Sequence, residues 1–462
     1  MLRNRKIKWH ILPVILSLAW PTMLEQLMQT AVQYIDTAMV AVLGTQATAA
    51  VGATSTVNWL VGSTISALSV GFLAVIARAY GGQDLQRTKK ASAQAVLGVL
   101  VMGSLVTLLT LGLSGQVPRW MQVEEGLQGV ASRYFFILYL PMLPRTATII
   151  FGTVLRAVGD TKTPMRVGLL VNLCNVVLNF FFIYPSRMVQ LFGKAFFIPG
   201  FGWGVEGAAL ASAVAFTLGG ICITVVFWRH KVVSPKGQSI RPDKDILKPC
   251  LKIALPNMFQ RFGTSLGYVV FASMINALGE VAIAAHTIAN TVESAFYIPG
   301  YGMQTAAATL TGHAYGAKDQ QKMKDVATMF LPLEVALMVL SGGLLFAVAP
   351  WMMGLFSDNP DVIAQGALVL RMVAVTEPFY GVTIIIQGLM QGVGDTKTAF
   401  LYDVFGMWAV RIVGTFICTR WLSLGFVSAW GCMILHNMLL FILFLRYFIQ
   451  GRWNPLEKKH AM

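Results

Sequence analysis

The chain has 462 residues, of which 56% are hydrophobic and only 12% are charged. Soluble domains carry about 25% charged residues, so this composition excludes an ordinary water-soluble globular protein. The formal net charge of +15 would by itself suit a nucleic-acid-binding protein, but the positions of the basic residues lead to a different interpretation.

Long uncharged runs, such as 37–77, 91–118 and 421–445, indicate membrane-spanning segments, which need about 20 mostly apolar residues each. The runs are continuous and do not alternate, so they favour helices over barrel strands. We therefore predict an all-α polytopic membrane protein. The twelve expected spans are 13–35, 53–77, 93–115, 132–155, 167–186, 205–228, 253–275, 287–311, 327–348, 366–390, 402–419 and 425–446.

We expect the first span to be retained in the protein. It contains Pro21 and Glu25 and runs on towards Asp36, past the short apolar core of a signal peptide.

The basic residues lie mostly on one side of the membrane when the connections are assigned alternately inside and outside. The inside set includes the N-terminus, 78–90, 156–166, 229–252 and the C-terminal tail. By the positive-inside rule both termini are expected in the cytoplasm. The basic excess therefore reflects topology, and we expect no nucleic-acid partner.

The phrase AVGDTKTP at 157–164 returns as GVGDTKTA at 392–399. The shift between the two copies, the repeat offset, also brings Pro21 onto Pro256, and it holds without a gap from the first span to the fifth. The first half then has a longer outer loop, 184–204. We predict two six-helix bundles, 1–228 and 253–462 with the tail, joined by a cytoplasmic linker, 229–252. Six spans are an even number, so the halves are parallel, with a pseudo-two-fold axis along the membrane normal.

The repeated phrase itself predicts a turn and a helix start. Gly159 permits a positive φ, Thr163 suits an N-cap and Pro164 suits the first helical position. It lacks the spaced glycines and the strand of a phosphate-binding loop. We interpret it as a topological hairpin without chemistry of its own.

Two parallel bundles around a cleft favour a secondary transporter with alternating access. The chain has no nucleotide-binding motif, so an ion gradient or the substrate gradient must drive it. An enzyme would need clustered catalytic groups, which the scattered histidines do not supply, and we expect neither an enzyme nor a cofactor. The cysteines lack paired spacing, so we expect them to be reduced and no metal site to exist; they are Cys174, Cys222, Cys250, Cys418 and Cys432.

With its twelve expected spans and its repeated halves, the chain resembles the multidrug and toxic compound extrusion (MATE) family, bacterial type, over essentially its whole length. The resemblance rests on AWPTMLEQLMQTAVQYIDTAMVAVLG in the first span, ARAYGGQD after the second, LRAVGDTKTP, and ALPNMFQ with AAHTIAN in the second half. It is nearer to the DinF-like than to the NorM-like pattern. It implies a V-shaped pair of bundles in the cytoplasmic membrane that exports cationic, amphipathic compounds in exchange for H⁺ or Na⁺. We expect it to act as a monomer.

Asp36 is the leading candidate for ion or proton coupling, because a charge inside a bilayer is costly and is functional by default. It precedes Gly44 by eight residues, about 12 Å of helix, and so belongs to the outer half of the membrane. The residue at the repeat position is Phe271, so the second half has no equivalent acid. Asp36 acts either as a protonatable switch or as a packing group within the bundle.

Three asparagines of the fifth span, Asn172, Asn175 and Asn179, are spaced three and four apart and share one helix face. The resemblance implies that this face meets Asp36; interhelical packing is the alternative. Some DinF-like members carry an acid at the position of Asn179. Its absence here weakens a two-acid Na⁺ site, so we expect H⁺, with Na⁺ as the alternative ion.

The remaining polar residues of the spans are secondary candidates. NorM-like members place acids at positions matching Thr264 and Tyr380, so their second-half cation site is in doubt here. Glu293, Glu377, Asp403 and Arg411 are expected to pair with one another. Arg261 is an isolated cation in the seventh span. The expected substrate cavity is lined by Asn172, Tyr139, Gln33, Glu25 and Met28.

A lipid or lipid-linked oligosaccharide flippase of the same superfamily is the alternative function. Its cavity should be cationic to hold a diphosphate, and only Arg145 and Arg261 would serve here, against Asp36 and Glu25. A channel is disfavoured, because a symmetric pore lining conflicts with the mismatch between Asp36 and Phe271.

Overall fold

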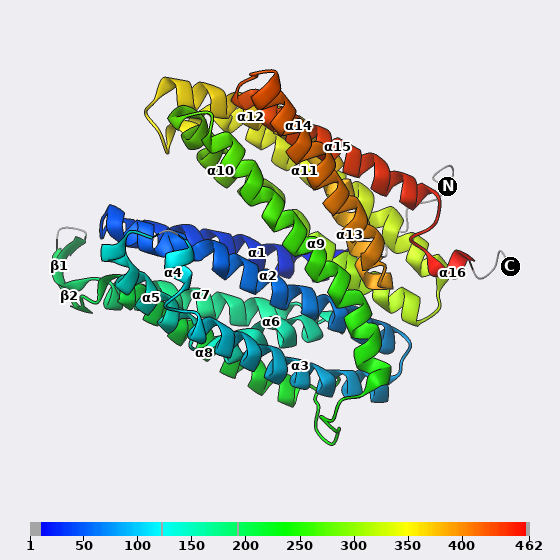
Figure 1. The fold of residues 1–462 in the computed structure, drawn as a ribbon. Coiled ribbons are helices and arrows are strands. Elements are labelled where there is room, and N and C mark those ends of the chain that lie inside the picture. Colours follow the sequence, from blue (N-terminus) through cyan, green and yellow to red (C-terminus); the bar gives the residue numbers. More distant parts are fainter. Residues whose placement is uncertain (1–10, 122, 192–193, 459–462) are drawn as a thin grey trace. The chain divides into compact units, whose positions relative to one another are not determined.

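The computed structural model describes residues 11–458 except 122 and 192–193. Long helices dominate this part of the chain (Figure 1). Twelve long helical segments are present in it, and each overlaps one predicted span. They are α1 (Leu12–Ala41), α2 (Thr45–Gly81), α3 (Leu85–Gly112), the pair α5 (Glu125–Tyr139) and α6 (Met142–Ala157), α7 (Lys162–Phe182), α8 (Gly204–Arg229), α9 (Lys244–Asn276), α10 (Glu280–Gly316), α11 (Gln320–Gly354), α12 (Pro360–Val393), the run from α13 (Thr396–Phe405) through α14 (Val413–Phe416) to Trp421, and α15 (Phe426–Ile449). Two short helices, α4 (Val117–Trp120) and α16 (Pro455–Lys458), complete the set.

Eight of the described segments are long and apolar enough to cross a membrane, and the pair α5–α6 makes a ninth. The three long helices outside that group are α1, α9 and α10. Each of them carries charged residues within its span, such as Asp36 in α1, Arg261 in α9 and Glu293 in α10. Polar residues of this kind lower the mean hydropathy of helices that line a protein interior.

The predicted repeat is visible in the helix boundaries. Helix α2 spans Thr45–Gly81 and α10 spans Glu280–Gly316, so the repeat offset carries both ends of α2 onto the ends of α10. Helices α3 and α11 begin at Leu85 and Gln320, again with the same offset. Two stretches with different side chains therefore form the same local structure, which supports the duplication.

Two local features differ from the expected spans. The fourth span breaks between α5 and α6, which are bent by 47°, because Pro141 stands at the break and a proline cannot continue the backbone hydrogen bonding. The outer loop expected at 184–204 contains an antiparallel hairpin, β1 (Pro185–Leu191) and β2 (Lys194–Phe201). The Ser186 hydroxyl and Gly200 form two hydrogen bonds across it, of 3.0 and 3.1 Å.

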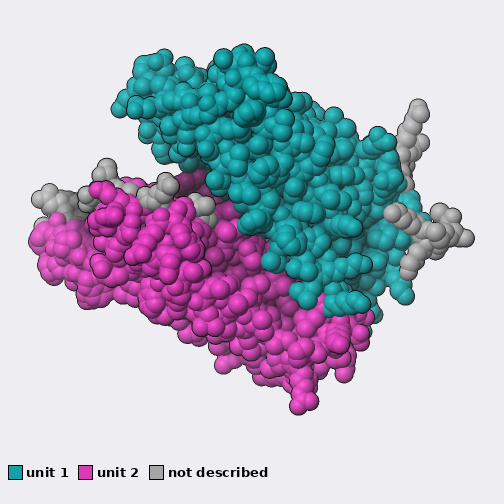
Figure 2. Space-filling view, viewed as in Figure 1, with its two compact units in different colours: residues 1–26, 73–84, 248–462 teal, residues 27–72, 85–247 magenta. Residues whose placement is uncertain are grey.

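The chain divides into two compact units (Figure 2). Unit 1 comprises residues up to Gln26, Leu73–Asp84 and residues from Lys248 onward. Unit 2 comprises Leu27–Phe72 and Leu85–Leu247. Helices α1 and α2 therefore contribute to both units. The predicted division into residues 1–228, 229–252 and 253–462 stays a prediction.

Buried apolar side chains form the core of unit 1. One cluster joins Ile15 and Leu18 of α1 to Phe330 of α11 and Leu389 of α12. A second cluster surrounds the fully buried Trp430 of α15. All five cysteines are free thiols, as the sequence predicts.

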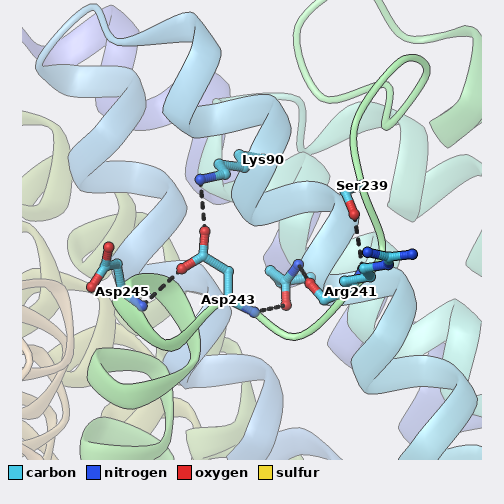
Figure 3. A network of polar contacts seen from close by, with 6 residues as sticks. Lys90, Ser239, Arg241, Asp243 and Asp245 are labelled. Carbon is cyan, nitrogen blue, oxygen red and sulfur yellow. Dashed lines mark hydrogen bonds and ion pairs between the residues drawn. The ribbon is translucent and has the colours of Figure 1, made fainter.

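The segment between α8 and α9 is tied to α3 by polar contacts (Figure 3). Lys90 Nζ lies 2.7 Å from Asp243 Oδ2, and the other Asp243 oxygen accepts from the backbone N–H of Asp245 at 2.8 Å. The Gln94 amide donates to the Arg241 carbonyl at 2.8 Å and accepts from the Asp243 N–H at 3.1 Å. The predicted linker is therefore an ordered part of unit 2 up to Leu247.

The repeated phrase forms the predicted turn, with a shifted helix start. Gly159 has φ of 91°. Thr163 is not the N-cap and Pro164 is not the first helical residue, because α7 begins at Lys162. The Asp160 carboxylate accepts from the Thr163 N–H at 3.0 Å, and at the second copy the Asp395 carboxylate accepts from the Thr398 N–H at 3.2 Å. The aspartate of the phrase is the capping group.

Candidate functional site

Asp36 meets the asparagine face of α7 inside unit 2. The Asn179 amide donates to Asp36 Oδ1 at 2.6 Å. Asn179 and Asn175 are 1% and 5% exposed, and Asn172 lies one turn earlier on the same helix face. The spacing of three and four residues therefore directs two buried amides at one carboxyl group, because successive helix turns stack such positions.

The amide of Asn175 fits the site in either orientation. With its nitrogen turned away from Asp36 it donates to Ser212 Oγ at 2.9 Å. With its nitrogen turned towards Asp36 it donates to Asp36 Oδ1 at 2.7 Å and Oδ2 at 3.0 Å, while its oxygen accepts from the Ser212 hydroxyl at 2.9 Å. Amide oxygen and nitrogen have nearly the same shape, so hydrogen bonding selects the second orientation when Asp36 is ionised.

The outer end of α1 is held to the end of α7 independently of this carboxyl group. The Tyr184 hydroxyl donates to the Met39 carbonyl at 2.8 Å. The position of Asp36 against α7 is therefore supported by a contact that does not depend on its charge.

The other candidates in α1 lie apart from this site. Gln33 is exposed and Met28 is half-buried. Glu25 is half-buried and belongs to unit 1. Eleven residues separate it from Asp36 on the same helix, which is about 16 Å at 1.5 Å per residue, so the two carboxyl groups do not form one site.

Tyr139 belongs to a second polar group of unit 2. It is fully buried, stacks on Phe135 with ring centroids 4.3 Å apart, and donates to Asn58 Oδ1 at 3.4 Å. Arg145 donates to the same oxygen at 2.8 Å and its guanidinium lies 4.5 Å from the Phe216 ring centroid. Arg145 is thus held by an amide and an aromatic face.

The expected pairing among Glu293, Glu377, Asp403 and Arg411 is found only in part, since Arg411 attracts the Glu293 carboxyl group electrostatically without a close ion pair. Within the described residues no ion pair joins them; the Asp403 carboxylate instead accepts from the amides of Gln260 and Gln387, the latter at 3.0 Å. The Arg411 guanidinium lies 4.8 Å from the ring centroids of Tyr268 and of Phe271. Aromatic faces and amides replace the predicted salt bridges, because both can satisfy a buried charge.

The positions that match the NorM-like cation site hold neutral groups. Thr264 donates to the Gln260 carbonyl of its own helix at 2.8 Å. The hydroxyl groups of Tyr380 and Tyr301 are 3.0 Å apart. Arg261 donates to Asn257 Oδ1, one helical turn away, at 3.1 Å.

Glu334 is a buried acid that the sequence-based candidates omit. It lies in α11 and is 0% exposed. The signal was available, because Glu334 is the only charged residue between Asp325 and Asp358. Among the described residues no group of three or more His, Cys, Asp or Glu side chains could hold a metal ion.

Known proteins match this chain over nearly its whole length. The MatE family model matches residues 21–181 and 256–417. The probable multidrug resistance protein NorM of Thermotoga maritima is 26% identical over 444 residues, covering 95% of this chain and 92% of its own. The probable multidrug resistance protein YpnP of Bacillus subtilis is 24% identical and covers 97% of each chain.

Solved structures confirm the predicted fold class. A crystal structure of MATE in the bent conformation matches with a TM-score of 0.87 at 22% identity, covering 97% of each chain. An outward-facing conformation of a multidrug resistance MATE family transporter matches with a TM-score of 0.86 at 23% identity, covering 96% of each. Several similar relatives are named NorM, and the expected nearness to the DinF-like pattern stays a prediction. Since the family model matches well over half of the chain, the protein belongs to the MatE family of multidrug and toxic compound extrusion transporters.

Proposed function

We propose that this transporter exports cationic, amphipathic compounds in exchange for protons, and that Asp36 carries the exchanged proton. The observation that carries the proposal is the enclosure of Asp36 by the amides of Asn179 and Asn175. The names of the relatives, multidrug resistance proteins, support small-molecule drugs as the substrate class.

The Asn175 amide suits a carboxyl group that changes its protonation state. When Asp36 is ionised, the amide nitrogen faces it and the Ser212 hydroxyl donates to the amide oxygen. When Asp36 is protonated, the reversed amide accepts the carboxyl proton and donates to Ser212 Oγ, in the other orientation described above. An amide has both a donor and an acceptor end, so one rotation satisfies both states.

The same donors favour H⁺ over Na⁺ as the coupling ion. A bare cation is bound by oxygen ligands, whereas Asp36 receives N–H groups from Asn179 and Asn175. Proton exchange needs no further ligands. Transport would follow alternating access between the two halves, with protonation of Asp36 and release of the compound on the outer side.

The membrane setting belongs to the same proposal. The basic connections support a cytoplasmic (inner or plasma) membrane location with both termini inside; the basic N-terminal residues 3–8 lie outside the described part of the chain. We propose a monomer with halves 1–228 and 253–462.

The test is dye export by proteoliposomes under an imposed pH gradient and, separately, under a Na⁺ gradient. Wild-type protein should respond to the pH gradient alone. Asp36→Asn should abolish the response, and Asp358→Asn, which changes an exposed carboxyl group in a connection, should not. Export by Asp36→Asn at the wild-type rate would refute the assignment. A wild-type protein that exports no cationic dye would favour the flippase.

A further inference from the structure

The Glu334 carboxyl group has no hydrogen-bond partner among the described residues. It lies in the middle of α11, it is 0% exposed, and neither of its oxygens is bonded to a described group. A buried carboxylate without a partner is strongly disfavoured relative to one in water. The group is therefore expected to be neutral in this conformation, with its proton on one of the two oxygens.

A slot between two other helices receives this side chain. A Cβ added to Gly300 of α10 would lie 2.5 Å from Glu334 Oε1, and one added to Gly381 of α12 would lie 3.1 Å from Glu334 Cγ. Met338 and Ile384 complete the walls. Two glycines thus leave the room that the carboxyl group occupies.

The equivalent positions in the first half of the chain contain no acid. At the repeat offset, Glu334 corresponds to Val99, Gly300 to Ile65 and Gly381 to Thr146. Val99 is 4% exposed, and Ile65 and Thr146 are also buried. Packing at this position therefore does not need a carboxyl group. The second half has an acid where the first has an aliphatic residue, and glycines where the first has two larger residues, so the three differences compensate one another in volume.

Two further acids, Glu377 and Glu293, belong to the same electrostatic neighbourhood, and Arg411 is a cation that attracts one of them, Glu293. Glu377 of α12 is 2% exposed and has an unpartnered oxygen, and Glu293 of α10 is also buried. The remaining titratable groups on the facing parts of α10 and α12 are the phenols of Tyr297, Tyr301 and Tyr380, all neutral near pH 7. Arg411 stacks on aromatic rings, as described above. Since carboxylates in one low-dielectric region repel one another, they favour bound protons.

We propose that Glu334 is a proton-binding site of unit 1, separate from Asp36, that holds a proton while the glycine slot is closed and releases it to water when the slot opens. On release the O–H bond of the carboxyl group breaks, the proton passes to water and the carboxylate remains. A proton is the expected ligand because, among the described residues, no group of three or more His, Cys, Asp or Glu side chains could hold a metal ion. Only the use of this proton in transport rests on the proposed antiport.

Infrared difference spectroscopy of the purified full chain, titrated with acid and base, tests the site directly. A protonated carboxyl group without hydrogen bonds absorbs at the high-frequency end of the carboxylic acid range and shifts in D₂O. The band is expected in wild type and in Asp36→Asn, and it should be lost in Glu334→Gln. Persistence of the full band in Glu334→Gln would overturn the proposal, and so would a wild-type spectrum without it.

Glu334→Val provides a second variant, since valine fills the equivalent position in the first half. It should also lack the band, and either variant that elutes as a folded monodisperse protein decides the question. The measurement needs no transport, so failure of the antiport and failure of this site are distinguishable. In proteoliposomes where antiport operates, Glu334→Gln should move one proton fewer per dye molecule than wild type, while an unchanged ratio would remove the site from the transport cycle.

Discussion

At the scale of single residues, the sequence predicts the meeting of Asp36 with the asparagines of α7 but not the details that govern it. Spacing places Asn175 and Asn179 on one face, and the family resemblance supplies their partner. The rotation available to the Asn175 amide depends on Ser212, a residue of α8 that no local pattern connects to Asp36. Glu334 stands out in the sequence as an isolated charge, but its surroundings do not, because its slot is made by Gly300 and Gly381, which lie on two other helices.

Replacing Asn179 by Ala tests the hydrogen bond to Asp36. A hydrogen bond to a charged group contributes about 1.5–3 kcal/mol, so the ionised state loses roughly tenfold or more in population. We expect dye export driven by a pH gradient to fall by about that factor. Asn172→Ala, about two turns from Asn179 on the same face, is the matched control and should keep proton coupling. Equal loss in both variants would mean that the face has a packing role only.

Among the helices, the twelve long segments follow the twelve spans expected from the sequence, because a lipid environment requires long continuous hydrogen-bonded helices, although α1, α9 and α10 are less apolar than the other nine. Their interruptions are less predictable. The sequence does not tell which proline interrupts a helix. Pro141 stands at the break between α5 and α6, whereas Pro378 lies inside the continuous helix α12. The hairpin β1–β2 is fixed by pairing between its two strands. The cap of α7 belongs to Asp160 and not Thr163, because its side chain reaches the first free N–H groups.

Backbone contacts between α2 and α10 give a second prediction. A Cβ on Gly81 would overlap the carbonyl of His313, and one on Gly316 would overlap the carbonyl of Arg78. Arg78 also donates to the Gly392 carbonyl at 3.3 Å and stacks on Tyr315. Gly81→Ala should therefore lower the free energy of unfolding by about 1–3 kcal/mol.

The control for that variant is Gly343→Ala in α11, where a Cβ meets nothing within 4 Å. Alanine there should leave stability unchanged or raise it by about 0.5–1 kcal/mol, because it restricts the unfolded chain. Thermal unfolding of both variants, followed by circular dichroism, provides the comparison. Equal melting temperatures for Gly81→Ala and Gly343→Ala would contradict the expectation, because they would mean that α2 and α10 can move apart at Gly81 without loss of stability.

The contact between Lys90 and Asp243 should make the stability of the fold depend on pH in a direction that can be derived. The hydrogen bond from Lys90 is the main reason why the pKa of Asp243 is lowered, and the Asp245 backbone N–H adds to it. A carboxyl group with a lowered folded pKa stabilises the fold above its unfolded pKa of about 4 and loses that contribution as the pH falls through the folded value. The melting temperature of Asp243→Asn should thus be lower than wild type at pH 7 and equal to it in strong acid. Asp245→Asn, whose backbone N–H is unchanged, is the control; a difference that persists in strong acid would contradict the ionic origin.

Across the whole molecule, the two repeats share their helix boundaries but differ in the positions of their acidic residues. The repeat offset predicts matching helix boundaries, and the structure reproduces them in α2 and α10. The same offset pairs Asp36 with Phe271 and Glu334 with Val99, so each half carries an acid, half-buried for Asp36 and fully buried for Glu334, where the other has an apolar residue. Sequence alone identifies the first of these differences, whereas the second becomes meaningful only with the glycine slot.

The central claim is that Asp36 couples proton movement to export, and the proton flux itself is its most direct test. Proteoliposomes loaded with a pH-sensitive fluorophore receive a cationic dye on one side, and the change of internal pH is recorded as the dye crosses. We expect a dye-driven proton flux in the opposite direction for wild type and for Asp358→Asn, and none for Asp36→Asn. An undiminished proton flux in Asp36→Asn would contradict it.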